Sequence, residues 1–221
     1  HGSLLVMDGD TPRRTGGSPD GRLFLIPTAA LDIAPTWQEA AAMRGTGSNA
    51  VSGREVFVPE MFAHTPAKPL LIDRPLFRLP PRLLFASSPP AVAFGVLDTA
   101  WQSAAAELGA KVSSLSGQVL RDQAPIQELI ANASAALRAV RAGHREAMTA
   151  VWNVAQTGAT VPPRLKAELY ASNFYALDVV RDTISRLYTR GTRAAFVQGN
   201  PIERALRNLH AIVFGVEIGR F

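Results

Sequence analysis

The sequence predicts an α+β protein that is mostly helical, with a partial β-domain followed by an up-and-down antiparallel four-helix bundle. Two observations carry this prediction. Short apolar runs bounded by turn-forming residues, which are typical of strands, are confined to residues 1–59. After residue 91, apolar residues recur at steps of three and four, the period of an amphipathic helix. We expect residues 1–63 to form the β-domain, 64–90 a proline-rich connector and 91–221 the bundle.

Four strands are expected in the N-terminal part. Residues 4–9 (LLVMDG) and 22–27 (RLFLIP) are apolar runs between turn formers, and a third strand is expected near Leu31–Ile33. The segment DTPRRTGGSPDG between the first two is rich in glycine, proline and aspartate, which predicts a mobile surface loop. A fourth strand is expected at Glu55–Pro59, after a polar, glycine-rich loop.

That glycine-rich loop has the composition of a loop that contacts a ligand. Gly45, Gly47 and Gly53 allow positive φ angles and close approach of the backbone to a bound group. Side-chain donors alternate with these glycines: Arg44, Thr46, Ser48 and Asn49. A hairpin loop built from ordinary turn formers has the same composition, so the residues alone leave both interpretations open.

Residues 64–90 contain seven prolines, among them the pairs Pro80–Pro81 and Pro89–Pro90. Each proline fixes φ and removes a backbone donor, so we expect no continuous helix in this segment. The segment also contains many leucines and phenylalanines, too many for a free tether. We therefore expect it to pack across the bundle.

The first two expected helices follow this connector. The first is rich in alanine and is expected over residues 91–112, ending at the turn signals of residues 113–117. In the second, apolar residues recur at helical spacing from Ile126 to Trp152, which predicts one apolar stripe over about seven turns. Gly158 is expected to stop this helix.

The third helix is expected over residues 163–189, again with apolar residues at helical spacing. Asn200 is a good N-cap for a fourth helix, and Pro201 suits its first position. Glu203 would lie in the first turn, where the helix dipole favours an acid. Four helices joined by short connections make an up-and-down bundle.

Composition excludes several kinds of site. The 221 residues contain no cysteine, which excludes a disulfide framework, a thiolate nucleophile and a cysteine-type metal site, and fits a reducing compartment. The four histidines are far apart and lack paired-ligand spacing, so no metal is predicted. They are His1, His64, His144 and His210.

Charge and hydropathy limit the partners. The 23 Lys and Arg residues exceed the 18 Asp and Glu residues, giving a net charge of +5, but the arginines are scattered over the expected helices. A nucleic-acid-binding protein concentrates such charge on one face, so no nucleic-acid partner is predicted. We find no apolar run of the roughly twenty residues that span a bilayer and no signal-peptide pattern. We expect a cytoplasmic protein without a membrane partner.

Two motifs resemble a known family. The segment TWQEAAAMRGTGSNAVSGREVFVPE, residues 36–60, is similar to the end of the middle β-domain in the acyl-CoA dehydrogenase superfamily, in particular its flavin-dependent monooxygenase branch. Trp37, Met43–Ser48 and Val56–Glu60 match, while Ala42 replaces the usual glycine. The resemblance implies a flavin cofactor, FMN or FAD, with candidate contacts from the loop. These contacts are Arg44, Thr46 and Ser48.

The second motif, TRGTRAAFVQGNPIERALRNLHA at residues 189–211, resembles the family's glycine loop, its turn and its R-D-L-H helix. The family places such a loop near the flavin of a neighbouring subunit. This implies flavin-phosphate contacts from four residues: Arg190, Gly191, Thr192 and Arg193. Considered without the family, Gly191 at the end of a helix is equally well explained as a C-cap, with the arginines favouring the helix dipole.

The resemblance also implies a catalytic residue. His210 matches the histidine of the R-D-L-H helix, where an imidazole could donate a proton during oxygen activation or deprotonate a phenolic substrate. Asn208 stands where the family usually has aspartate. Glu217 is the alternative, because it lies near the position where acyl-CoA dehydrogenases place their base. A histidine at the edge of an apolar stripe is the plain structural interpretation of His210.

Three functions follow from the resemblance. The first is a monooxygenase that acts on a small molecule with reduced flavin from a separate reductase. The second is an acyl-CoA dehydrogenase that oxidises a CH–CH bond with FAD. The third is an inactive helical fragment that forms oligomers, since a homo-oligomer, dimer or tetramer, is implied in every case.

Family members begin with a helical domain and first β-strands that this sequence lacks. We therefore expect the C-terminal part of a longer protein, through truncation, proteolysis or a mis-started reading frame. This leaves open whether the 221-residue chain binds flavin.

Overall fold

The computed structural model describes residues 2–64 and 72–218, and the chain divides into two compact units. The β unit consists of His1–Ala40 and Arg44–Ile72. The helical unit consists of Ala41–Met43 and Asp73–Phe221. Each unit is described separately.

The β unit contains a three-stranded antiparallel sheet in the order β1 (Gly2–Leu5), β6 (Gly21–Phe24), β9 (Ala63–His64). Its register pairs Gly2 with Phe24 and Leu23 with His64. Three further antiparallel pairs complete the β unit as described. They are β2 (Met7–Asp8) with β3 (Thr11–Pro12), β4 (Arg14–Thr15) with β5 (Ser18–Pro19), and β7 (Asp32–Ala34) with β8 (Ala50–Ser52).

The segment expected to be an open loop between the first two strands forms short hairpins instead. Gly16 and Gly17 take φ angles of 61° and 83°, which lets two residues turn the chain between β4 and β5. Asp20 is buried and accepts a hydrogen bond from Arg22 at 3.0 Å. The glycines therefore form the turn of a hairpin, and the expected mobility of the segment stays a prediction.

The strand expected at Glu55–Pro59 is absent, so that prediction was wrong. The strand of this region is β8, which ends at Ser52 and pairs with β7. Glu55 follows with a φ of 52°, a left-handed conformation that strands do not use. The chain therefore turns where the sequence pattern predicted extension.

The β unit has little interior of its own. Among its described residues only Asp20 is buried, and several large apolar side chains are exposed. Leu25 is 60% exposed and Phe57 is 86% exposed. Three short strands with exposed apolar side chains are marginal by themselves.

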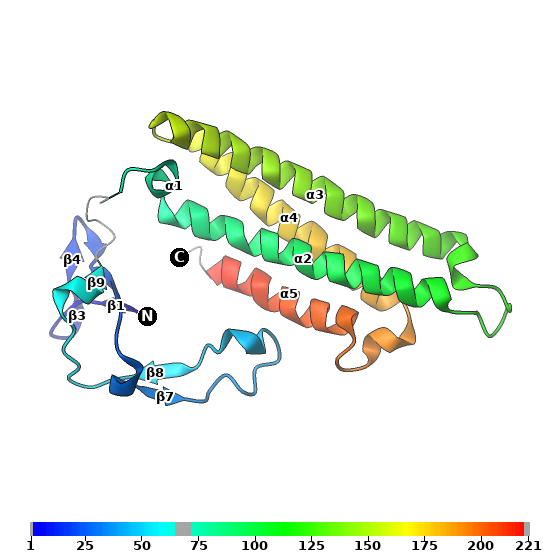
Figure 1. Cartoon of the computed structure of the whole chain (residues 1–221), viewed down its shortest axis with the longest axis horizontal. Coiled ribbons are helices and arrows are strands. Elements are labelled where there is room, and N and C mark those ends of the chain that lie inside the picture. The colour runs from blue at the N-terminus through cyan, green and yellow to red at the C-terminus, as the bar shows by residue number, and fades with distance from the viewer. Residues whose placement is uncertain (1, 65–71, 219–221) are drawn as a thin grey trace. The chain divides into compact units, whose positions relative to one another are not determined.

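The helical unit is an up-and-down bundle of four long helices, preceded by the single turn α1 (Pro75–Arg78) (Figure 1). The long helices are α2 (Pro81–Ala110), α3 (Ala124–Thr157), α4 (Pro163–Arg190) and α5 (Pro201–Ile218). The predicted fold class is confirmed. Asn200 caps α5 as expected, because its Oδ1 accepts the Ile202 amide hydrogen at 2.9 Å.

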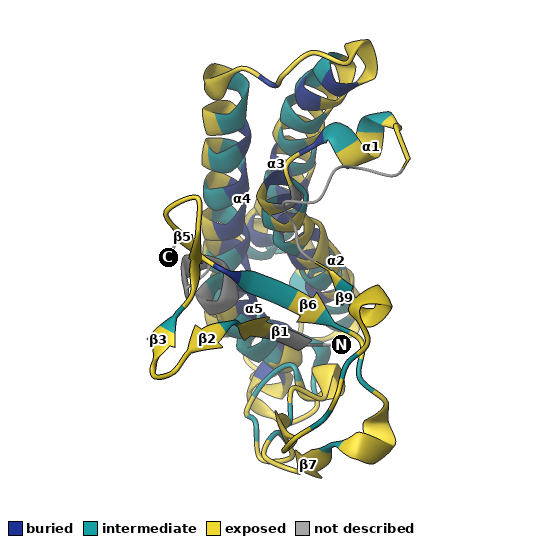
Figure 2. Cartoon of the chain, turned by 90° about the vertical axis from the view of Figure 1, so that its left-hand side faces the viewer, coloured by how far each residue is buried: buried dark blue, intermediate teal, exposed yellow. Residues whose placement is uncertain are grey.

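The bundle core runs along the facing sides of these helices, as the buried positions of Figure 2 show for α3 and α4. Fully buried side chains at its centre include Leu97, Leu108, Val180, Ile184, Leu187, Ile202 and Leu209. By length and composition alone, Arg82–Ala110 in α2 could cross a membrane. Part of this segment, including Phe94 and Leu97, packs in the bundle core, whereas Phe85 and Val92 are exposed.

The expectation that residues 64–90 contain no continuous helix was wrong, because α2 begins at Pro81 and contains Pro89 and Pro90. Two prolines remove the amide hydrogens that would bond to the carbonyls of Phe85 and Ala86. Side chains take those carbonyls instead. Ser88 Oγ donates to Phe85 O at 3.0 Å, and Asn173 Nδ2, from α4, donates to Ala86 O at 3.0 Å.

Candidate functional site

The loop after α4 starts with a glycine that no other residue replaces easily. Gly191 caps α4, and its amide donates to the Leu187 carbonyl oxygen at 3.0 Å. A Cβ built on Gly191 would lie 2.3 Å from that same oxygen. The C-cap interpretation of Gly191 therefore has direct structural support.

Glu107 of α2 holds both ends of this loop. The Thr192 hydroxyl donates to its Oε2 at 2.5 Å, and Asn200 Nδ2 donates to its Oε1 at 2.9 Å. Thr192 is buried, and its one hydroxyl hydrogen is used in this bond. Thr192 thus orders the loop, and Glu107 is a residue that sequence reasoning missed. Glu107 is one of two acids in the alanine-rich helix α2, the other being Asp98, and this was the available signal.

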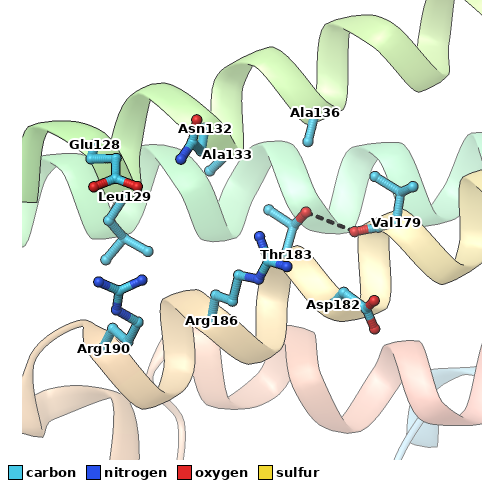
Figure 3. Close-up of a pocket in the computed structure, with 10 residues that line it drawn as sticks. All are labelled: Glu128, Leu129, Asn132, Ala133, Ala136, Val179, Asp182, Thr183, Arg186 and Arg190. Atoms are coloured by element: carbon cyan, nitrogen blue, oxygen red, sulfur yellow. Dashed lines mark hydrogen bonds between the residues drawn. The ribbon is translucent and has the colours of Figure 1, made fainter. Parts of the chain in front are cut away.

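Arg190 lies in a cleft of about 340 Å³ between α3 and α4 (Figure 3). Arg186, one turn earlier on α4, lines the same cleft, and Leu129 and Ala133 of α3 form its apolar wall. Glu128 and Asp182 also line it, but among the described residues neither arginine makes an ion pair within 4.0 Å. Arg186 was not predicted, although its spacing of four from Arg190 was the signal.

The remaining predicted residue of this loop, Arg193, is exposed in the short helical turn Arg193–Phe196. Its side chain makes no hydrogen bond or ion pair within the described part of the chain. The structure therefore brings Arg186 and Arg190 together in a cleft and leaves Arg193 open to solvent.

His210, the predicted catalytic residue, is exposed on α5. Among the side chains that the structure describes, which end at Val213, its imidazole has no hydrogen-bond partner. The alternative interpretation, a histidine at the edge of an apolar stripe, stays open, because the neighbouring Leu209 is buried. Glu217 also belongs to α5, but its side chain lies outside those that the structure describes.

The other polar residues of α5 hold the segment Ala41–Met43. Arg207 donates to the Ala41 carbonyl oxygen and, at 3.1 Å, to Glu203 Oε2. The hydrogen bond from Arg207 lowers the pKa of Glu203 from its ordinary value. Asn208 Oδ1 accepts the Met43 amide hydrogen at 3.0 Å. Arg207 and Asn208 therefore fix the residues that precede the glycine-rich loop.

The glycine-rich loop itself lies in the β unit and is exposed. Arg44 Nε donates to the Ala40 carbonyl oxygen at 2.6 Å, and the hydroxyl oxygens of Thr46 and Ser48 lie 3.0 Å apart. Gly47 has a φ of 58°, as a turn with a left-handed residue requires. The three predicted contacts Arg44, Thr46 and Ser48 thus lie on one short turn.

No group of three or more His, Cys, Asp or Glu residues in the described part of the chain could hold a metal ion. The absence of a metal site stays a prediction.

Comparisons with known proteins agree on a family. The family model described as acyl-CoA dehydrogenase, C-terminal domain, matches residues 89–214, from within α2 to α5. An indole-3-acetate monooxygenase of Pseudomonas putida is 23% identical over 96% of this chain and 54% of its own length. The oxygenase subunit HsaA of a flavin-dependent monooxygenase from Mycobacterium tuberculosis is 24% identical over 96% and 55%.

Among solved structures, XiaF from Streptomyces sp. in complex with FADH2 and glycerol has a TM-score of 0.76 and 21% identity. It covers 99% of this chain and 61% of its own chain. At that identity the likeness shows the fold. The chain spans about half the length of the curated relatives that it matches. It is a member of the acyl-CoA dehydrogenase family and includes the C-terminal domain of that family.

Proposed function

We propose that this chain belongs to the oxygenase component of a flavin-dependent monooxygenase, which oxidises a small organic substrate with reduced flavin supplied by a separate reductase. One observation carries the proposal. Relatives named as monooxygenases match along 96% of this chain, and on the matched helix α5 the imidazole of His210 is exposed and has no hydrogen-bond partner among the described side chains. The name "oxygenase subunit" of one relative supports a separate reductase as partner.

Arg186 and Arg190 of the α3/α4 cleft suit the phosphates of a flavin, and of the two carboxylates that also line the cleft, Asp182 is paired with Arg181. Arg186 and Arg190 place two guanidinium groups on successive turns of α4, about 6 Å apart along the axis. Guanidinium groups bind phosphate oxygens with paired hydrogen bonds. Two of them suit a pyrophosphate better than a single phosphate, so FAD is favoured over FMN. Arg193 could extend this contact, whereas the hydroxyl of Thr192 already donates to Glu107.

A bound reduced flavin would supply the electrons and activate dioxygen. The role of His210 is then to give or take a proton at the substrate, since an imidazole exchanges protons near neutral pH. Arg44, Thr46 and Ser48, on their exposed turn, are proposed as further flavin contacts. A homo-oligomer, dimer or tetramer, and a cytoplasmic location complete the proposal.

Anaerobic titration of the 221-residue chain with reduced FAD and reduced FMN tests the cofactor. We expect FAD to bind more tightly, and Arg190→Gln and Arg186→Gln to weaken it by about tenfold each, the loss of one charge-assisted hydrogen bond. Arg138→Gln, an exposed arginine elsewhere on α3, is the matched control. Binding that is equal in all four proteins would reject the phosphate site.

Turnover tests the reaction. Reduced FAD, aromatic acids and ¹⁸O₂ are supplied together, and products are followed by mass spectrometry. We expect one ¹⁸O atom in the product and a loss of about 100-fold for His210→Ala, within the usual range for a general acid or base. Flavin reduction by an acyl-CoA under anaerobic conditions, without oxygen incorporation, would instead identify a dehydrogenase.

A further inference from the structure

A second cleft, of about 280 Å³, lies between α2 and α5. Its α2 wall includes Val92, Gly95 and Val96, which are apolar and small. Its α5 wall is mixed: Pro201 and Ala205 are apolar, and Arg204 and Asn208 are its polar residues. All these residues belong to the helical unit, so the cleft is defined within one compact body.

Both polar groups of the α5 wall have hydrogens to donate. The Arg204 side chain is exposed and makes no hydrogen bond or ion pair among the described residues. The nearby acid Glu203 is paired with Arg207 instead. Asn208 uses its oxygen to accept the Met43 amide hydrogen, which leaves its Nδ2 hydrogens without a partner in the described part of the chain.

No carboxylate is among the described residues that line this cleft. Thr99, the other polar residue on the α2 wall, donates its hydroxyl hydrogen to the Gly95 carbonyl oxygen at 3.0 Å. Across the cleft, one positive charge and one amide donor therefore face an apolar wall. This combination selects an anionic oxygen group attached to an apolar body.

The selection of an anion depends on residue 208 being an asparagine and not an aspartate. An aspartate at position 208 could accept the same Met43 amide hydrogen. Its negative charge, four residues from Arg204 along α5, would however repel an anion in the cleft. An asparagine holds the chain in the same way and keeps two hydrogens for a ligand. The asparagine thus removes a charge from the cleft without removing the contact that orders it.

We propose that the α2/α5 cleft binds the carboxylate of a small apolar acid through Arg204 and Asn208, with its apolar body against Val92, Gly95 and Val96. That this acid is the substrate rests on the proposed monooxygenase function, whereas the binding itself does not. The volume of 280 Å³ lies just below the usual range for ligand sites, about 300–1,000 Å³, which restricts the ligand to the size of one or two rings.

Binding is measured with the full 221-residue chain, without flavin, by isothermal titration and by ligand-observed NMR. The probes share one ring system and differ in head group: indole-3-acetate, indole-3-acetamide and tryptamine. We expect the carboxylate to bind about tenfold to hundredfold more tightly than the amide, as for a charge-assisted hydrogen bond, and tryptamine to bind most weakly.

Two variants locate the carboxylate. Arg204→Gln and Asn208→Asp should each bring indole-3-acetate to the affinity of the amide, and Asn208→Asp should keep the unfolding midpoint because the Met43 contact survives. Arg138→Gln is the control for loss of a positive charge and should bind as the parent protein does.

Equal affinity for the three head groups overturns the proposal, and so does unchanged carboxylate binding in both cleft variants. Discrimination that survives in Arg204→Gln and Asn208→Asp but is lost in Arg138→Gln would move the site to α3 and also overturn it. Because flavin is absent, carboxylate binding without later ¹⁸O incorporation would reject the monooxygenase function alone.

Discussion

Replacing Asn173 of α4 by leucine should destabilise the bundle, because the Ala86 carbonyl group of α2 then loses its hydrogen-bond donor. Asn173 is 1% exposed, and its Nδ2 occupies the Ala86 carbonyl oxygen that Pro90 leaves without an amide donor. Its Oδ1 lies 2.9 Å from His144 Nδ1, which must then carry a hydrogen. Leucine fills the same space but makes neither bond.

The magnitude follows from the two groups left behind. A buried polar group without a partner costs about 1–3 kcal/mol, which applies fully to the Ala86 carbonyl group. His144 is only half-buried, so its loss adds less because water can reach the ring. We expect a loss of about 2–4 kcal/mol in the free energy of unfolding. For a chain of this size that lowers the midpoint by about 4–16 °C.

Thermal and urea unfolding, followed by far-UV circular dichroism, measure this loss. Asn153→Leu is the matched control, because Asn153 is exposed on α3, and it should change stability by less than about 0.5 kcal/mol. Pro90→Ala supplies the missing amide donor, so Asn173→Leu should cost about 1 kcal/mol less in that background. Equal costs in both backgrounds, or a cost as small as the control, would refute the reasoning.

Three further changes test the loop and the half-buried His144. Glu107→Ala should lower the free energy of unfolding by about 1.5–3 kcal/mol, because it removes the charged acceptor of the hydrogen bonds from Thr192 and Asn200. Glu107→Gln should cost less, as measured by urea unfolding. Equal costs for the two variants would contradict this role of the Glu107 charge. Gly191→Ala should cost at least about 2 kcal/mol by the same assay, because its Cβ would meet the Leu187 oxygen; a neutral change would show that the cap can relax. Burial lowers the pKa of His144, against the opposing hydrogen bond with Asn173, so the unfolded chain takes up a proton first. The stability contributed by neutral His144 is therefore full above about pH 6.5 and is lost as pH falls through the lowered pKa of the folded state. Unfolding midpoints measured from about pH 8 to pH 5 should therefore decline less for His144→Gln than for the parent protein.

Local sequence signals determine the helices of this protein. Periodic apolar residues, Gly158 and the Asn200 cap determine where α3 and α5 begin or end, because these signals act within a few residues of the backbone they control. Family motifs identified the exposed arginines and His210 for the same reason, since each belongs to a contiguous segment. The role of His210 and of the predicted flavin contacts stays a prediction.

Tertiary structure decided what depends on distant partners. Local rules place a helix break at Pro89–Pro90, yet α2 continues because Asn173, 87 residues later, satisfies a carbonyl that proline leaves open. Thr192 was predicted from its glycine loop to contact a phosphate, but its hydroxyl donates its hydrogen to Glu107 of another helix. Likewise the pairing of Arg204 and Asn208 with an apolar wall of α2 exists only once the helices pack. Hydrogen bonds and clefts join residues through space, and a sequence pattern reports only neighbours along the chain.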